Sequence, residues 1–204
     1  MDGIYISIDD NDAGIDLVRE TFVQGGVIHR ESGPAVIARN PTTNEIVREE
    51  WWSHGSRHRV GGPAIKWTGH YDDELWYQDG QLHREDGPAH IARDCDGRVH
   101  YEHWYKRGQH HRSGAAASIY YAADGSALST YWYLEGSLHR DDGPALSEIH
   151  EDGVGLVREE WWAHGVRHRT NGPAITNYTG GCVSSVQFFA QGVEISSEST
   201  FEPG

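Results

Sequence analysis

Large side chains recur in pairs along this chain, and polar, Gly-containing stretches separate them. Each pair stands seven and six positions before a His-Arg dipeptide. These dipeptides begin at His29, His58, His83, His111, His139 and His168, with successive spacings of 29, 25, 28, 28 and 29 residues. Such self-similarity predicts a tandem-repeat architecture. The pairs are Phe22-Val23, Trp51-Trp52, Trp76-Tyr77, Trp104-Tyr105, Trp132-Tyr133 and Trp161-Trp162.

Each repeat is predicted to contain a β-hairpin between its aromatic pair and its His. In the third copy Asp79-Gly80 supplies the residues that adopt positive φ in a two-residue hairpin loop. With that turn, Trp76 lies opposite His83. Because side chains alternate along a strand, this count places Trp76 and His83 on one sheet face and Arg84 on the other.

A Gly-Pro-Ala motif follows the hairpin and leads into the next repeat. Pro ends the strand because it cannot donate a backbone hydrogen bond. Counting across the later Asp96-Gly97 turn places the small Ala89 beside Trp104 of the following copy, which predicts an antiparallel meander. The motif begins at Gly33, Gly62, Gly87, Gly143 and Gly172, and the fourth copy reads Ala115-Ala116-Ala117 instead.

We therefore expect an all-β fold, an elongated and twisted antiparallel β-meander of about seven tandem hairpin repeats of 25–29 residues. The expected domain is single and spans residues 1–204. It begins with an N-terminal strand or cap at 1–16 and continues with six repeats at 17–180. A decayed seventh repeat and C-terminal cap follow at 181–204, marked by Phe188-Phe189 and Gly192.

The repeat unit resembles MORN-type repeats, short β-hairpin modules with an aromatic pair, a Gly turn and a terminal Gly motif. The residues that carry the resemblance in the third copy are Trp76-Tyr77, Gly80 and the terminal Gly87; the repeat length and the His83-Arg84 and Gly87-Pro88-Ala89 signatures depart from the usual pattern. This chain looks like a longer variant with a His-Arg-x-Asp-Gly-Pro-Ala signature, over residues 17–195. The resemblance implies the hairpin-repeat fold and, more loosely, roles in protein or lipid contact.

Charge and targeting signals narrow the function classes. The chain has 31 acidic and 17 basic residues, a formal charge of −14, which disfavours binding to long nucleic acid. Cys95 and Cys182 have neither disulfide-framework nor zinc-site spacing, which is typical of a reducing compartment. The first residues carry no secretory signal and no apolar run reaches membrane-span length, so we expect a cytoplasmic protein, in the host cytoplasm if viral, without membrane contact.

No catalytic motif is present, so we expect neither enzymatic activity nor a cofactor. Asp9, Asn11, Gly14 and Glu20 match positions of a calcium loop, but Ala13 stands at a ligand position, and no calcium site is expected. No metal site is expected either, and the candidate ligands for one are the histidines that break the repeat. His90, His103 and His110 are brought near one another by the hairpin count, although no carboxylate joins them and His is also common on sheet surfaces.

The repeat Arg has two interpretations. It can pair with acidic residues of the following turn, such as Glu85-Asp86 or Asp141-Asp142, and the count also sets Glu50 opposite Arg59 and Glu160 opposite Arg169. It can instead contact a partner together with the second aromatic of each pair. On that hypothesis the binding residues are Arg59, Tyr77, Arg84, Tyr133, Arg140 and Arg169.

These patterns favour a non-enzymatic scaffold that engages a protein partner with a basic surface. A phage- or pathogen-encoded inhibitor of a nucleic-acid-handling or defence protein would fit that description. The alternative is a small-ligand or nucleotide-binding protein in which aromatics stack a base and Arg holds phosphate. Exposed end strands would also permit a homodimer.

Overall fold

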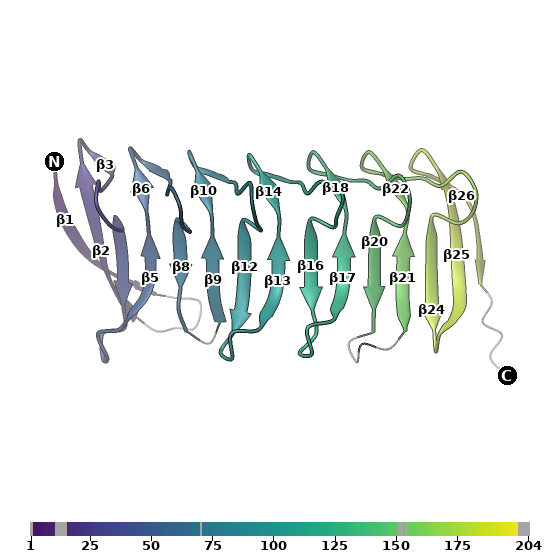
Figure 1. Cartoon of the computed structure of the whole chain (residues 1–204), viewed down its shortest axis with the longest axis horizontal. Coiled ribbons are helices and arrows are strands. Elements are labelled where there is room, and N and C mark those ends of the chain that lie inside the picture. Colours follow the sequence, from purple (N-terminus) through teal and green to yellow (C-terminus); the bar gives the residue numbers. More distant parts are fainter. Residues whose placement is uncertain (1, 11–15, 70, 151–152, 154, 200–204) are drawn as a thin grey trace. The chain divides into compact units, whose positions relative to one another are not determined.

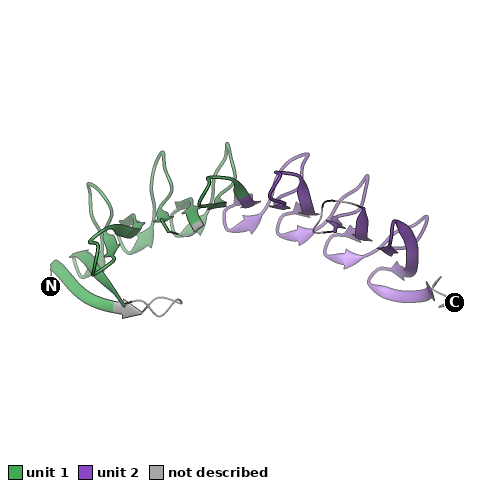
Figure 2. Cartoon of the chain, turned by 90° about the horizontal axis from the view of Figure 1, so that it is seen from below, with its two compact units in different colours: residues 1–99 green, residues 100–204 purple. Residues whose placement is uncertain are grey.

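The structure is a computed structural model, which describes residues 2–10, 16–69, 71–150, 153 and 155–199. Every regular secondary-structure element in these ranges is a β-strand (Figure 1), as the sequence predicts. The described part contains no helix long and apolar enough to cross a membrane. The chain divides into two compact units, residues 1–99 and 100–204 (Figure 2).

Unit 1 is an antiparallel meander in which neighbouring strands follow the order β1-β2-β4-β5-β8-β9-β12. A short hairpin arm follows each of β2, β5 and β9, so this unit holds the first three repeats. The strands of the meander are β1 (Gly3–Asp10), β2 (Asp16–Gln24), β4 (Val36–Arg39), β5 (Ile46–Glu50), β8 (Ile65–Trp67), β9 (Tyr71–Leu75) and β12 (His90–Asp94). The hairpin strands are β3 (Val27–Ile28), β6 (Trp52–Ser53), β7 (Ser56–Arg57), β10 (Tyr77–Gln78) and β11 (Gln81–Leu82).

Unit 2 repeats the same design in the order β13-β16-β17-β20-β21-β24-β25-β26. Its strands are β13 (Val99–His103, which begins at the last residue of unit 1), β16 (Ser118–Tyr121), β17 (Ala127–Tyr131), β20 (Leu146–Ile149), β21 (Leu156–Glu160), β24 (Ile175–Thr179), β25 (Cys182–Ala190) and β26 (Val193–Ser199). The hairpins are β14 (Tyr105–Lys106) with β15 (Gln109–His110), β18 (Tyr133–Leu134) with β19 (Ser137–Leu138), and β22 (Trp162–Ala163) with β23 (Val166–Arg167).

The predicted hairpin register is confirmed. Asp79 and Gly80 have φ values of 50° and 78°, as the two central residues of a type I′ turn require. The amide of His83 donates to the carbonyl of Trp76 at 3.0 Å, so these two residues face each other on the backbone. Gln191-Gly192 form the same turn, with φ values of 49° and 81°, between β25 and β26. The decayed seventh repeat therefore keeps its hairpin.

Successive hairpins stack on one another within each unit. The amide of Gly80 donates to the carbonyl of Arg57 in the preceding hairpin at 2.9 Å, and Asp79 N–H donates to Nδ1 of His58 at 3.1 Å. In unit 2 the amide of His164 donates to Nδ1 of His139 at 3.3 Å. The repeat His is thus an acceptor between repeats, which fits its predicted structural role.

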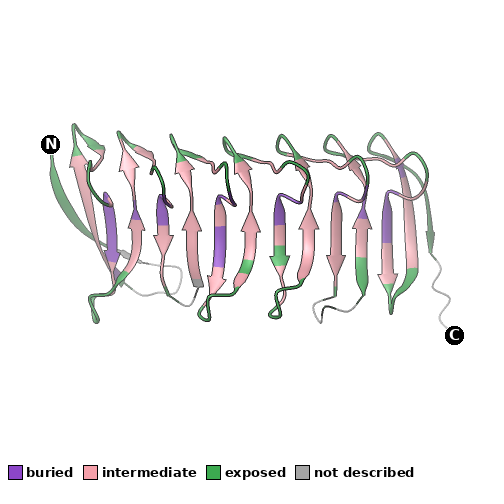
Figure 3. Ribbon diagram, in the orientation of Figure 1, coloured by how far each residue is buried: buried purple, intermediate pink, exposed green. Residues whose placement is uncertain are grey.

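The core is thin and begins at the Ala of each Gly-Pro-Ala motif. Ala145 is completely buried; its carbonyl accepts from the amide of Trp132 at 2.7 Å. Since Leu146 pairs with Glu160, Ala145 stands beside Trp161 of the next repeat, the relationship that counting predicted for Ala89 and Trp104. Buried positions gather on the strands that follow the hairpins (Figure 3). The fully buried alanines are Ala35, Ala64, Ala89, Ala117, Ala145 and Ala174.

Candidate interaction surface

The repeat Arg lies over the first aromatic of its own repeat. Cζ of Arg84 is 3.9 Å from the ring centroid of Trp76, and Nη1 of Arg84 donates to the carbonyl of Pro88 at 3.3 Å. The prediction that this Arg and Trp lie on opposite faces is therefore wrong. Neither residue is inside a strand, so the alternation of side chains along a strand does not apply to them. The same stack joins Arg30 to Phe22, Arg59 to Trp51, Arg112 to Trp104, Arg140 to Trp132 and Arg169 to Trp161.

The Gly of Gly-Pro-Ala makes room for this stack. A Cβ atom at Gly87 would lie 2.7 Å from Cζ of Arg84, and one at Gly143 would lie 2.7 Å from Cζ of Arg140. Neither glycine has a positive φ, so it is the close approach of the guanidinium that favours Gly at both positions. In the fourth repeat Ala115 stands at the equivalent position, and Arg112 still lies over Trp104 with Cζ 4.0 Å from the ring centroid.

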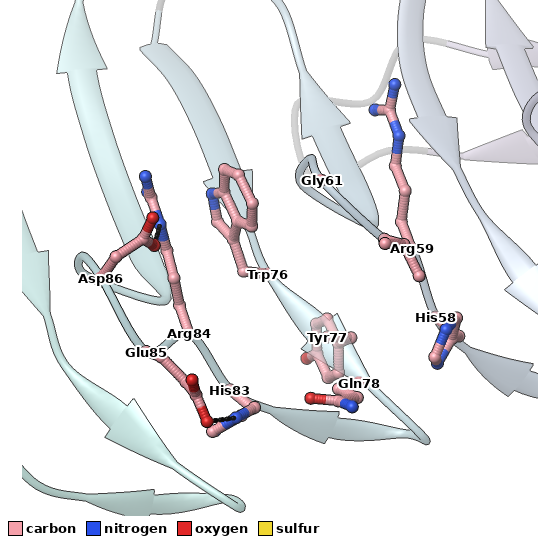
Figure 4. Close-up of a pocket in the computed structure, with 11 residues that line it drawn as sticks. His58, Arg59, Gly61, Trp76, Tyr77, Gln78, His83, Arg84, Glu85 and Asp86 are labelled. Carbon is pink, nitrogen blue, oxygen red and sulfur yellow. Dashed lines mark hydrogen bonds and ion pairs between the residues drawn. The ribbon is translucent and has the colours of Figure 1, made fainter.

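A groove of about 500 Å³ separates the second and third repeats (Figure 4). Three of the predicted binding residues, Arg59, Tyr77 and Arg84, line it. Trp76 forms part of the wall of the groove, and Glu85 and Asp86 line the groove as well. Arg59 and Arg84 are already stacked on indoles of the protein. The groove therefore presents two carboxylates beside two guanidinium groups that are already engaged.

The loops after the repeat Arg expose carboxylates. In the loop that follows Arg84, the side chain of Asp86 is 87% exposed, whereas that of Arg84 is 22% exposed; Nε of Arg84 lies 3.2 Å from Asp86 Oδ1. In unit 2, Asp142 is 82% exposed and lies 2.9 Å from Nε of Arg140. Hydrogen bonding from Arg140 holds the pKa of Asp142 below its usual value. The predicted pairing with acidic loop residues is confirmed.

The second aromatics belong to a different set of contacts. Glu50, which is 1% exposed, accepts from Nε1 of Trp52 at 3.0 Å and from Nε of Arg57 at 3.1 Å. Arg57 also lies over the rings of Trp52 and Tyr77, with Cζ 4.9 and 5.7 Å from their centroids. The predicted pairing of Glu50 with Arg59 is wrong.

The duplicated block in unit 2 repeats this network. Glu160 accepts from Nε1 of Trp162 at 2.9 Å and from Nε of Arg167 at 3.0 Å, so its predicted pairing with Arg169 is also wrong. Arg167 lies over Trp162 and Phe189. Sequence reasoning missed Arg57 and Arg167, although both fall within the stretches 46–65 and 156–175, which are identical at fifteen of twenty positions.

In the fourth repeat two histidines replace this Glu and Arg. His103 directly precedes the first aromatic, as Glu50 and Glu160 do. His110 directly precedes the repeat His, as Arg57 and Arg167 do, and its ring lies 4.1 Å from that of Tyr105 and 4.6 Å from that of Tyr133 between centroids. The centroids of His103 and His110 are 5.8 Å apart.

These histidines belong to a larger aromatic surface. Cross-strand pairing sets His103 opposite Ser118 and Ser118 opposite Tyr131, while Tyr120 lies two positions along β16 on the same face. The ring of Tyr120 is 5.3 Å from His103 and 6.2 Å from Tyr131 between centroids, and the residue is 38% exposed. The Tyr–His surface is defined as His103, Tyr105, His110, Tyr120, Tyr131 and Tyr133, and it includes the predicted binding residue Tyr133.

Burial favours the neutral forms of three side chains of the Tyr–His surface. It lowers the pKa of His110, whose Nδ1 is buried without a hydrogen-bond partner. Burial also raises the pKa of Tyr131 and of Tyr133. These three side chains therefore present neutral rings.

The three candidate metal ligands belong to different units. In unit 2, the ring centroids of His103 and His110 are 5.8 Å apart; in unit 1, Nε2 of His90 lies 3.1 Å from Asp73 Oδ1. Within the ranges that the structure describes, no group of three or more His, Cys, Asp or Glu residues could hold a metal ion. Of the calcium-loop positions, Asn11 and Gly14 lie outside the described residues.

Comparisons with models of known protein families, with characterised proteins and with solved structures found no match to this chain. The resemblance to MORN-type repeats thus rests on the repeat pattern and stays a prediction.

Proposed function

We propose that the chain is a non-enzymatic scaffold, MORN-like in its repeats, that binds a protein partner with a basic surface. The observation that carries the proposal is the difference in exposure between basic and acidic side chains. The repeat arginines are stacked on aromatics within the protein, whereas loop carboxylates such as Asp86 and Asp142 are 87% and 82% exposed. At these loops an approaching molecule thus meets carboxylates before it meets the repeat guanidinium groups.

The composition of unit 2 strengthens this point. Residues 100–204 include 13 acidic and 7 basic side chains. Five of the seven basic side chains are held internally over Trp rings or beside a buried Glu: Arg112, Arg140, Arg158, Arg167 and Arg169. Such a surface attracts a basic partner and accelerates encounter. A nucleic-acid-binding cleft has that chemistry, so we propose an inhibitor of a nucleic-acid-handling or defence protein as the functional class.

The groove between the second and third repeats favours a second candidate, a small-ligand or nucleotide-binding protein. Its volume of about 500 Å³ is typical of ligand pockets, and Trp76 with Tyr77 could stack a base. The carboxylates of Glu85 and Asp86 line the same groove and would repel phosphate. This opposition places the ligand-binding function second.

A peptide-binding experiment separates the two candidates. The probes are a fluorescent peptide of alternating Arg and Gly, a matched peptide of alternating Glu and Gly, and ATP. We expect the full chain to bind the Arg peptide, less tightly as salt rises, and to bind neither other probe. Binding of ATP without binding of the Arg peptide would overturn the proposal in favour of the second candidate.

Matched charge variants show whether the binding is local. Asp141→Asn with Asp142→Asn removes two exposed loop charges, and Glu194→Gln with Glu198→Gln removes two from the exposed strand β26. We expect the loop pair to weaken peptide binding several-fold more than the β26 pair. Equal effects would show that net charge alone attracts the peptide, and would contradict a defined binding surface.

A further inference from the structure

The fold has a recurrent way of holding a guanidinium between two hairpins. Arg57 lies over Trp52 of its own hairpin and Tyr77 of the next. In unit 2, Arg167 lies over Trp162 and Phe189 in the same manner. A cation over an aromatic ring is attracted by the negative face of the ring, and the attraction is stronger where water is partly excluded.

At the Tyr–His surface this internal cation is replaced by a neutral imidazole. His110 stands in the position of Arg57 and Arg167, between the rings of Tyr105 and Tyr133. No Arg or Lys among the described residues lies over the rings of Tyr120, Tyr131 or Tyr133. Part of the aromatic surface is open, since Tyr120 is 38% exposed.

A carboxylate stands at the edge of these rings. The hydroxyl of Tyr131 donates to Oε1 of Glu148 at 3.3 Å, and Glu148 pairs with Ser129, the residue opposite Tyr120. Arg158 lies opposite Glu148 in the strand register, but its guanidinium forms an ion pair with Glu160. A guanidinium from outside would therefore meet open tyrosine rings and a carboxylate that no Arg or Lys of this face is shown to neutralise.

We infer that the Tyr–His surface is the docking site for an arginine-bearing segment of the basic partner. The inference rests on the proposed function, and adds to it the place of binding and the side chain that is recognised. An incoming Arg stacks on Tyr120 and reaches Glu148, so it makes the same two kinds of contact, with a ring and with a carboxylate, that Arg57 and Arg167 make within the protein. Lys would gain less, because its ammonium group lacks the planar face of a guanidinium.

The test uses the full chain and the labelled peptide of alternating Arg and Gly, together with peptides in which Lys or uncharged citrulline replaces Arg. Tyr120→Ser removes the most exposed ring of the docking site. Tyr178→Ser is the control, because Tyr178 lies on the other face of the sheet, with its hydroxyl on Glu159 at 2.7 Å. We expect Tyr120→Ser to weaken Arg-peptide binding about tenfold, Tyr178→Ser to leave it unchanged, and citrulline to abolish it.

A second measurement does not depend on how a variant folds. In the unmodified chain with isotope-labelled tyrosine, the Arg peptide should shift the ring NMR signals of Tyr120, Tyr131 and Tyr133 and leave that of Tyr178 in place. Binding that shifts no signal of the Tyr–His surface and is weakened only by Asp141→Asn with Asp142→Asn would overturn this inference and keep the proposed function. Failure of the unmodified chain to bind the Arg peptide would overturn both.

Discussion

Cζ of Arg84 lies 3.9 Å from the ring centroid of Trp76, in a space that a side chain at Gly87 would fill. This relationship explains why His-Arg and Gly-Pro-Ala recur together. Arg covers the indole, Gly leaves room for Arg, and the buried Ala leaves room for the next indole. Within the signature, Arg, Gly and Ala therefore serve packing, whereas the exposed Asp86 is free of that role and belongs to the acidic surface of the proposed function.

Replacement of Arg84 by Ser should lower the free energy of unfolding by about 1–2 kcal/mol, because the indole loses both its cation and the packed side-chain stem. The control is Arg98→Ser, since the side chain of Arg98 is 58% exposed in a turn. Urea unfolding measures both variants. Equal stability of Arg84→Ser and Arg98→Ser would refute the structural role of the stack.

Gly87→Ala should destabilise the fold by displacing the guanidinium, at a cost of about 1–2 kcal/mol. Because the three atoms nearest to the added Cβ all belong to Arg84, the cost should largely vanish when Arg84→Ala is already present. Gly69→Ala is the control, because a Cβ there meets nothing within 4 Å and its φ is not positive. Additive effects in the double variant would contradict the direct contact.

Trp76→Ala and Trp132→Ala should each cost roughly 3–5 kcal/mol, because each removes a large ring that packs against Arg and the alanine strand. Thermal melting followed by circular dichroism provides the comparison. Parent-like melting of both variants would show that the repeat core lies elsewhere.

Acid should destabilise unit 2 through His110. Burial lowers its folded pKa below the ordinary value of 6.5, so the unfolded chain binds this proton more readily than the folded chain. The contribution of neutral His110 to the free energy of unfolding is fully present above about pH 6.5 and is lost as the pH drops below that value. His110→Phe keeps a ring between Tyr105 and Tyr133 and should flatten the stability profile, whereas exposed His150→Gln should not. Identical profiles for the parent and His110→Phe would exclude this contribution.

The sequence predicted the backbone better than the side-chain contacts. The Gly that ends each hairpin turn and the spacing of the aromatics predicted the register, and Trp76 does face His83 across the backbone. The alternation rule failed for Trp76 and Arg84 because Trp76 lies between β9 and β10 and Arg84 follows β11, outside the regular strands. An Arg that leaves a strand can turn back over a ring that counting places on the other face.

The candidate site was only partly predictable for a related reason. Crowded histidines drew attention to His103 and His110, but counting did not show which residues they replace in the other copies. The two histidines are informative because of their positions in the repeat, where Glu50 and Arg57 form an ion pair in another copy. That equivalence needs the three-dimensional contacts of Glu50, which counting had assigned to Arg59.

The most direct test of the account measures melting temperature and Arg-peptide affinity on the same three proteins. They are the parent, Arg84→Ser with Arg140→Ser, and a variant with Glu85→Gln, Asp86→Asn, Asp141→Asn and Asp142→Asn. We predict that the arginine variant melts several degrees lower yet binds with unchanged affinity while folded, whereas the acidic-loop variant melts like the parent and binds at least several-fold more weakly. Unchanged melting with lost binding in the arginine variant would contradict the account and restore the repeat arginines as the binding surface.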